Sequence, residues 1–340
     1  MPPLRLVMMG TGSFAEPTFA ALVSSPHPVV GLVTQPDRPP GHERSSTRRV
    51  GPGLKALAEQ HRIPCLQTEN INTPEGVCGV RAFQPDLLVV AAFGQILSKE
   101  VLGVAPLGGI NVHASLLPKY RGAAPVAWAI YHGETRTGVT IIRMSAAVDA
   151  GDILAQEALD ILPDETAGEL ESRLAVIGAR LAREVIDRLA VGPLHGTRQD
   201  KSLATKAPKL TKAHGLIDWG RDPLQVRNHI RAMQPWPTAY TFLHRRGHGP
   251  LRLLICRAGR ISARPPEQRD RPPGSIWPGG RSQELWVATG GDGALEIVEL
   301  QPAGKRRMTA AEFLRGHPLA EGDYLGDEQP LAAPCNSPSP

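Results

Sequence analysis

Three polar side chains in the middle of the chain have the types and the spacing that acyl transfer to an amine requires. Asn111 and His113 lie two residues apart in an apolar run, residues 109–113, that is typical of a β-strand. Side chains at positions i and i+2 of a strand share one face, so both can reach the same reacting atom. Asp149 follows a second strand-like run at residues 137–144. The amide could stabilise an oxyanion, the imidazole could move a proton, and the carboxylate could orient the imidazole.

Each of these residues, taken alone, has a simpler explanation. An isolated asparagine at a strand end commonly bonds the local backbone, and Asp149 could be an ordinary turn residue. Asp152 competes for the carboxylate role, because the segment reads Asp149-Ala-Gly-Asp152. The pairing of amide and imidazole directly before Ser115-Leu-Leu-Pro118 favours a catalytic role.

The order of these motifs resembles the folate-dependent formyltransferase superfamily. Further motifs narrow the resemblance to the family that formylates methionyl-tRNA. They are Thr34–Pro39, Arg121–Pro125, Ile217–Trp219, Arg231–Pro237 and Leu300–Lys305, and with the catalytic motifs they span roughly residues 4–325. The family pattern makes Asn111, His113 and Asp149 catalytic and favours Asp149 over Asp152.

The resemblance implies a reaction and its two substrates. The formyl group of 10-formyltetrahydrofolate would pass to the α-amine of methionine on initiator tRNA, giving N-formylmethionyl-tRNA for translation initiation. The folate is a cosubstrate, and no metal is expected, because the sequence has no cluster of metal ligands. The residues implied to line the folate site are Phe93, Gly94, Ile96, Ser115, Leu116, Leu117 and Pro118.

We expect tRNA contacts in two basic segments, of which the resemblance implies the first. The loop at residues 36–50 carries Arg38 and Arg44, and the segment 201–212 carries Lys206 and Lys209. Further candidates are Lys201, Lys212, Arg245, Arg246 and Arg252. The loop departs from the family pattern, because His42 stands where an arginine is usual, and the turn at Gly12-Ser13 departs as well. The catalytic trio is unaffected by both departures.

The distribution of charge is consistent with a polyanionic partner. Residues 1–188 contain 17 Lys and Arg against 19 Asp and Glu, a net charge of −2. Residues 201–281 contain 16 against 4, a net charge of +12. A basic stretch of this kind fits nucleic-acid binding, but a solvated arginine-rich surface would give the same count.

Length and the pattern of apolar runs predict two domains, since 340 residues exceed the usual size of one. The first half alternates strand-like and helix-like runs, which is typical of a parallel α/β sheet. The second half has short strand-like runs between Gly and Pro residues, which suggests a small β-barrel. We expect a Rossmann-like formyltransferase domain at 1–191, a linker at 192–212, a tRNA-binding domain at 213–328 that the resemblance makes OB-like, and a disordered tail at 329–340.

Cysteine usage and hydropathy indicate the cellular setting. The four cysteines, at positions 65, 78, 256 and 335, form no CxxC pair, which argues against a disulfide framework or a structural zinc site. No stretch approaches the roughly 18 apolar residues of a membrane span, and the N-terminal apolar run is short for a signal peptide. We expect a cytoplasmic protein with no membrane partner, and the resemblance suggests a monomer.

Two other functions stay open at this stage. A formyltransferase acting on a small amine, such as an amino-sugar nucleotide, would share the catalytic trio, although the basic second half favours tRNA. A non-catalytic RNA-binding protein would not need the trio. Dinucleotide binding at Gly10-Thr-Gly12 is disfavoured, because the third glycine of GxGxxG is missing and no acidic residue follows the second strand.

Overall fold

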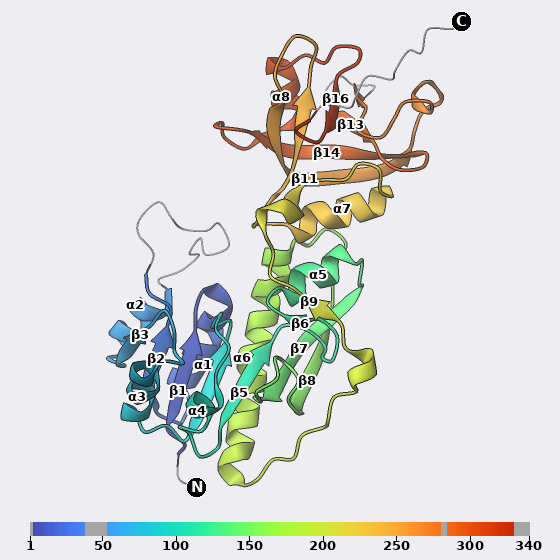
Figure 1. Cartoon of the computed structure of the whole chain (residues 1–340). Coiled ribbons are helices and arrows are strands. Elements are labelled where there is room, and N and C mark those ends of the chain that lie inside the picture. Colours follow the sequence, from blue (N-terminus) through green and yellow to red (C-terminus); the bar gives the residue numbers. More distant parts are fainter. Residues whose placement is uncertain (1–2, 38–52, 280–283, 330–340) are drawn as a thin grey trace, which may run out of the picture. The chain divides into compact units, whose positions relative to one another are not determined.

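The structure is a computed structural model that describes residues 3–37, 53–279 and 284–329. The chain divides into two compact units (Figure 1). Unit 1 consists of Met1–Ala129 and Glu134–Leu210, and unit 2 consists of Ile130–Gly133 and Thr211–Pro340. The boundary after Leu210 lies near the end of the 192–212 segment that we expected to join two domains.

A seven-stranded sheet forms the centre of unit 1, in the order β3-β2-β1-β4-β5-β7-β8. Strands β1 to β5 run parallel, which confirms the predicted Rossmann-like sheet. Strand β7 runs antiparallel to β5, and β8 pairs antiparallel with β7 at the edge of the sheet, where residues 144–152 join the two as a hairpin. The strands are β1 (Leu6–Gly10), β2 (Val29–Thr34), β3 (Cys65–Gln67), β4 (Leu87–Ala91), β5 (Gly109–His113), β7 (Arg136–Arg143) and β8 (Ile153–Asp160).

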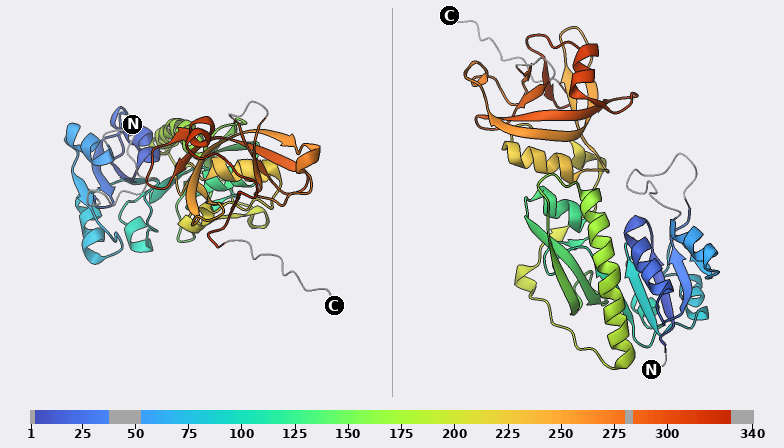
Figure 2. Two further views of the ribbon diagram at one scale, coloured as in Figure 1. Left: turned by 90° about the horizontal axis from the view of Figure 1, so that it is seen from above. Right: turned by 180° about the vertical axis from the view of Figure 1, so that it is seen from behind.

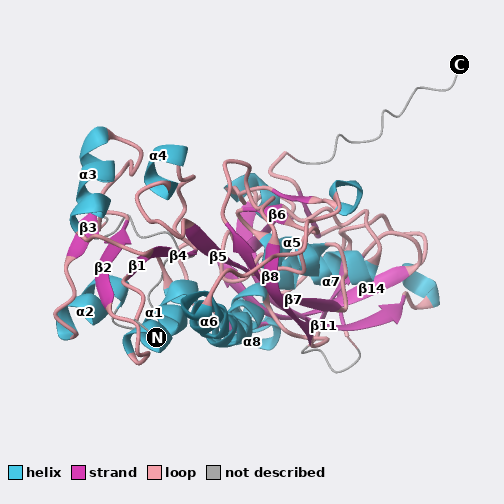
Figure 3. Cartoon of the chain, turned by 90° about the horizontal axis from the view of Figure 1, so that it is seen from below, coloured by secondary structure: helices cyan, strands magenta, loops and turns pink. Residues whose placement is uncertain are grey.

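Helices cover both faces of this sheet (Figure 3), with α1 and α6 on one face and α3 and α4 on the other. This arrangement explains why β1 and β4 are apolar and buried along their whole length. The helices are α1 (Glu16–Val23), α2 (Gly53–Gln60), α3 (Pro74–Ala82), α4 (Lys99–Leu102), α5 (Pro125–Tyr131) and α6 (Ala167–Val191).

Helix α6 supports the strand that carries the amide and the imidazole. It begins at a capping box, in which Thr166 and Glu169 satisfy each other's backbone N–H groups. Its apolar face packs along the sheet (Figure 2). Gly178 lies so close to β5 that a Cβ atom there would sit 2.6 Å from Val112 Cγ1. A residue with a side chain at this position would therefore force Val112 or the helix to shift.

Unit 2 is an antiparallel, nearly closed barrel, as predicted, with strands in the order β12-β13-β14-β11-β10-β16. Strand β15 pairs with β14, and a bridge between Ser275 and Tyr324 joins the two ends of the sheet. The elements are α7 (Pro223–Ala232), β10 (Ala239–His244), β11 (Leu251–Ala263), β12 (Ile276–Pro278), β13 (Leu285–Ala288), β14 (Gly293–Pro302), β15 (Met308–Thr309), α8 (Ala310–Gly316) and β16 (Tyr324–Gly326).

A buried histidine in α7 makes the stability of unit 2 depend on pH. His229 is 4% exposed, and its Nε2 donates to the His214 carbonyl at 2.7 Å. Burial lowers the pKa of His229, and the charge of Arg221 adds to this, whereas the hydrogen bond to His214 and the charge of Asp218 oppose it. Because the unfolded chain then binds more protons than the folded one, stability should fall as pH drops through the ordinary histidine range.

Urea titrations between pH 8 and pH 5.5 would measure this effect. We expect the unfolding midpoint of the intact chain to decline on acidification. The His229→Asn variant, whose amide can still donate a hydrogen bond, should decline less steeply. Equal slopes for the two proteins would show that His229 does not contribute.

Among the described residues, no helix combines the length and the apolar character needed to cross a membrane.

Candidate active site

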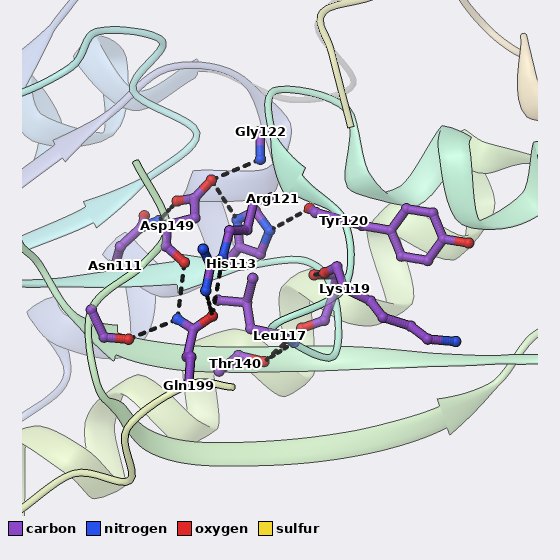
Figure 4. A network of polar contacts seen from close by, with 12 residues as sticks. Asn111, His113, Leu117, Lys119, Tyr120, Arg121, Gly122, Thr140, Asp149 and Gln199 are labelled. Atoms are coloured by element: carbon purple, nitrogen blue, oxygen red, sulfur yellow. Dashed lines mark hydrogen bonds and ion pairs between the residues drawn. The ribbon is translucent and has the colours of Figure 1, made fainter. Parts of the chain in front are cut away.

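The structure brings Asn111, His113 and Asp149 together (Figure 4). Asn111 and His113 lie on the same face of β5, and Asp149 lies in the hairpin between β7 and β8. Antiparallel pairing of β5 with β7 brings this hairpin to β5. Asn111 Nδ2 donates to Asp149 Oδ1 at 3.2 Å, and His113 Nδ1 lies 3.6 Å from Asp149 Oδ2. Asp152, the competing carboxylate, is exposed to solvent.

The imidazole of His113 is also held by a hydrogen bond from its second nitrogen, Nε2, to a backbone carbonyl group. Its Nε2 lies 2.9 Å from the Tyr120 carbonyl oxygen, so the proton on Nε2 is donated there. The side chain is 6% exposed. Nδ1 is therefore the nitrogen that can take up a proton, and the nearby carboxylate of Asp149 would stabilise the resulting charge. This arrangement suits a residue that accepts a proton during the reaction.

The carboxylate of Asp149 is fixed by donors on both oxygens. Oδ1 accepts from Asn111, and Oδ2 accepts from the Gly122 N–H at 2.9 Å. Gly122 has φ 128°, and a Cβ atom there would lie 2.4 Å from the Ala207 carbonyl oxygen. Only glycine therefore fits at this position of the short strand β6 (Arg121–Gly122), which pairs with β9 (Lys206–Ala207).

Comparison with known proteins decides the family. A model of the formyl transferase family matches residues 4–186, and a model of the formyl transferase C-terminal domain matches residues 209–318. The methionyl-tRNA formyltransferase of Geobacter sulfurreducens is 44% identical over 327 residues, covering 96% of this chain and 98% of that protein. The methionyl-tRNA formyltransferase of Bacillus subtilis is 41% identical over 322 residues, covering 95% and 98%.

This chain belongs to the methionyl-tRNA formyltransferase family. Solved structures of two more distant proteins share its fold. The N-formyltransferase of Helicobacter canadensis, solved with folinic acid and dTDP-3-aminofucose, aligns with a TM-score of 0.62 at 14% identity, over 86% of this chain and 98% of that one. HypX of Aquifex aeolicus, solved with tetrahydrofolic acid, aligns with a TM-score of 0.60 at 15% identity, over 92% and 47%. At such identities the likeness concerns the fold alone.

The residues expected to line the folate site of this formyltransferase form two groups. One is the loop that follows β4, with Phe93, Gly94 and Ile96, and the other is the turn 115–118 that follows β5. Because β4 and β5 are parallel neighbours, both groups lie at the same edge of the sheet. Open α/β sheets bind ligands at the carboxyl ends of their strands, so the position fits a cosubstrate site.

These seven residues differ in solvent exposure, and therefore in whether their side chains could contact a ligand. Ile96 is 64% exposed, and Gly94 beside it is also open to solvent. Phe93, by contrast, is 2% exposed and packs in the apolar core of unit 1. Ser115 and Leu117 are buried, whereas Leu116 and Pro118 are half-buried. We therefore expect Ile96 to contact a ligand directly and Phe93 to support the loop from below.

Two polar residues that the sequence analysis missed hold the turn at 115–118. Thr140 Oγ1 donates to the Ser115 carbonyl at 2.6 Å and accepts from the Leu117 N–H at 3.1 Å. Gln156 Nε2 donates to Thr140 Oγ1 at 2.8 Å and to the Leu117 carbonyl at 3.0 Å. Thr140 and Gln156 are paired across β7 and β8, so their side chains lie on the same face of the sheet. The sequence did not reveal this, because the register between the two strands is not specified locally.

Tyr120 and Gln199 were also missed. The Tyr120 hydroxyl donates to Glu134 Oε1 at 2.9 Å, and burial, together with this carboxylate, raises the pKa of Tyr120 well above its ordinary value. The phenol therefore stays a hydrogen-bond donor and holds in place the residue whose carbonyl contacts His113. Gln199 donates from Nε2 to the Asp149 carbonyl at 2.9 Å.

Of the nine residues expected to contact tRNA, the structure places seven, namely Lys201, Lys206, Lys209, Lys212, Arg245, Arg246 and Arg252. Lys206 and Lys209 are both exposed in unit 1, and Lys206 lies on β9. Arg38 and Arg44 fall outside the described residues, as does His42. In unit 2, the guanidinium of Arg252 lies 4.1 Å above the ring of Tyr240, where it borders a surface pocket lined also by Phe242 and Pro250.

Among the residues that the structure describes, no three His, Cys, Asp or Glu side chains are grouped so that they could hold a metal ion.

Proposed function

We propose that this formyltransferase transfers the formyl group of 10-formyltetrahydrofolate to the α-amine of methionine on initiator tRNA. The observation that carries the proposal is the arrangement of Asn111, His113 and Asp149 at the end of β5. Full-length similarity to methionyl-tRNA formyltransferases supports the choice of acceptor. The product, N-formylmethionyl-tRNA, would serve translation initiation in the cytoplasm.

The reaction follows from the positions of the three side chains. The neutral amine attacks the formyl carbon, and a tetrahedral intermediate with an oxyanion forms. Asn111 Nδ2 donates to that oxyanion, and His113 Nδ1 accepts the proton that the amine nitrogen loses. Asp149 stabilises the imidazolium. The bond from the formyl carbon to the folate nitrogen then breaks as the imidazolium of His113 gives its proton to that nitrogen, which regenerates the neutral ring. The products are the formyl amide and tetrahydrofolate.

The acceptor needs little activation. A free α-amino group has a pKa near 8, so a substantial fraction is already neutral at the pH of the cytoplasm. The enzyme therefore has to orient the amine, receive one proton and stabilise one negative charge. The histidine, carboxylate and amide around β5 are sufficient for these tasks.

We propose that the folate binds beside the catalytic trio, against the loop 92–96 and the turn 115–118. The exposed apolar side chain of Ile96 supports this position, because it offers apolar area at the carboxyl edge of the sheet. The barrel of unit 2 would supply affinity for tRNA. Its basic composition and the exposed Arg252 support that role.

The test is formyl transfer from 10-formyltetrahydrofolate to three acceptors in parallel. These are initiator methionyl-tRNA, elongator methionyl-tRNA and an amino-sugar nucleotide. Activity confined to the initiator tRNA is the expected result. Activity on the sugar nucleotide alone would retain the trio and overturn the tRNA acceptor. Absence of activity on all three would reject the function.

We expect Lys206 and Lys209 to contact phosphates of the tRNA. Replacing either lysine by alanine should weaken the binding of any tRNA, whatever its base sequence. It should also reduce the slope of log Kd against the logarithm of the salt concentration by about 1. Fluorescence titrations of initiator tRNA between 50 and 200 mM salt would measure both effects. These concentrations span the range in which phosphate contacts lose most of their affinity.

Lys99 provides the matched control for this experiment. It is an exposed lysine of the same unit, but it lies on α4 rather than on the 201–212 segment. Its alanine variant should keep the salt slope of the unmodified protein. If the Lys206 and Lys209 variants behaved like the Lys99 variant, the 201–212 segment would not be part of the tRNA site.

A further inference from the structure

Gln199 is a buried amide whose hydrogen-bonding groups are all occupied by residues of the active site. It is 6% exposed. Its Nε2 donates to two carbonyl oxygens, those of Asp149 at 2.9 Å and Gly151 at 2.7 Å. Its Oε1 accepts from Arg121, from Nη2 at 2.7 Å and from Nε at 3.2 Å. Figure 4 shows the side chain lying between the Asp149 loop and Arg121.

The loop that Gln199 holds has an unfavourable backbone conformation. Asp149 has φ 49°, in the left-handed region that residues other than glycine rarely adopt. Such a conformation persists only where surrounding contacts enforce it. Gln199 binds the carbonyls of Asp149 and Gly151, on either side of Ala150, and so fixes the direction in which the Asp149 side chain leaves the loop.

The second contact of Gln199 reaches the same carboxylate by another route. Arg121 is followed by Gly122, whose N–H donates to Asp149 Oδ2 at 2.9 Å. Fixing the Arg121 side chain therefore also restrains the donor to Oδ2. That oxygen is the one that lies 3.6 Å from His113 Nδ1. One amide thus holds both the backbone of Asp149 and a hydrogen-bond donor to its side chain.

We propose that Gln199 is a positioning residue that aligns the Asp149 carboxylate with His113 for the proton transfer. The inference rests on the proposed function in one respect, namely that Asp149 and His113 act in the chemical step. Gln199 itself touches neither the imidazole nor, by this proposal, any substrate. Its effect on the reaction should therefore pass through Asp149.

Two substitutions test the proposal. Gln199→Ala removes all four hydrogen bonds. Gln199→Glu keeps the shape and the Arg121 partner but turns a donor into an acceptor that faces two carbonyls. Because misplacing a reacting group by about 1 Å can cost about 10²-fold in rate, we expect both variants to lose about this factor in kcat. KM for folate and for tRNA should change little. If the alanine variant does not fold, the isosteric glutamate variant supplies the measurement.

Asp200→Ala is the matched control. Asp200 is the next residue in the chain, and its Oδ1 accepts from the Ser202 N–H at 2.8 Å at the start of a short 3₁₀ helix, Lys201–Leu203. Its removal disturbs the same segment but leaves the contacts of Gln199 with Asp149 and Arg121 in place. We expect this variant to keep its kcat. An equal loss in this variant would mean that general loosening of the segment, rather than the Gln199 amide, is responsible.

A double-mutant cycle separates positioning from a structural role. If Gln199 acts through Asp149, then Gln199→Ala should cost nothing further in an Asp149→Ala background. If the loss in kcat of the double variant equalled the product of the two single losses, Gln199 would act by some other route. That result would overturn the proposal.

An observation that does not depend on activity completes the test. In protein labelled with ¹³C-histidine, the ring resonance of His113 should move in Gln199→Ala and stay in place in Asp200→Ala. If the unmodified enzyme formylates no methionyl-tRNA but this resonance moves, the proposed function fails and the positioning role stands. If the enzyme is active while both the resonance and kcat are unchanged in Gln199→Ala, the positioning role fails alone.

Discussion

Replacing His113 by alanine is expected to lower kcat about 10²–10⁴-fold, the range for loss of a positioned proton acceptor. The structure leaves one role open to this ring. Its Nε2 is committed to the Tyr120 carbonyl at 2.9 Å, and its Nδ1 faces the carboxylate of Asp149. A proton taken from the attacking amine would therefore come to Nδ1. Without it, the proton would have to pass to solvent from a site where the ring itself is only 6% exposed.

Single-turnover formylation with enzyme in excess would measure this loss without interference from product release. His61→Ala is the control, because His61 is an exposed histidine of the same unit that follows α2. Its rate should equal that of the unmodified enzyme. A His113→Ala variant that kept a tenth or more of the rate would contradict the proton-transfer role. A large loss would also exclude one of the two alternatives, an RNA-binding protein without catalysis.

Replacing Asn111 by alanine is expected to lower kcat by about 10²–10³-fold, the usual cost of losing a donor to an oxyanion. An amide nitrogen carries two protons. One proton on Nδ2 is donated to Asp149 Oδ1 at 3.2 Å, which fixes the orientation of the amide. The other proton can then point at the formyl oxygen. Because that oxygen carries full negative charge only in the transition state, the loss should fall on kcat rather than on KM.

Separate determination of kcat and KM for the folate therefore decides the role of Asn111. A rise in KM at constant kcat would identify it as a binding residue and contradict the prediction. Asn111→Asp should be at least as defective as the alanine variant, because it places a second carboxylate beside Asp149. Asn70, an exposed asparagine in the loop before α3, supplies the control substitution.

That Asn111, His113 and Asp149 meet could be predicted from the sequence, through strand alternation for the first two and through the family resemblance for Asp149. Asn111 and His113 share a face through the alternation of a single strand, and Asp149 follows the next long strand-like run. The alternation of strands and helices in unit 1 and the short strands of unit 2 could also be predicted from local sequence. Each element carries its own periodic pattern of apolar residues.

The residues that hold the trio could not be predicted, because their roles depend on contacts between distant segments. Gln199 lies 50 residues from Asp149 in the chain, in a segment whose mixed polarity resembles a linker. Thr140 and Gln156 became visible only with the register of β7 and β8. Phe93 was expected beside the ligand, yet its side chain packs in the core. An apolar residue after a buried strand fits both positions equally well.

The pairing of β6 with β9 determines where this enzyme can be joined to a relative in a chimeric protein. Thr205, just before β9, accepts from the Arg121 N–H through its carbonyl and from the Tyr120 N–H through its hydroxyl, at 2.9 and 2.8 Å. The segment after α6 therefore supports the loop that contacts His113 and Asp149. In a chimera joined at the end of α6, the segment that contains position 205 would come from the relative. Its contacts with the backbone of Tyr120 and Arg121 would then be mismatched. A chimera joined after Leu210 would inherit them intact, so the transferable catalytic module extends about twenty residues beyond the last long helix.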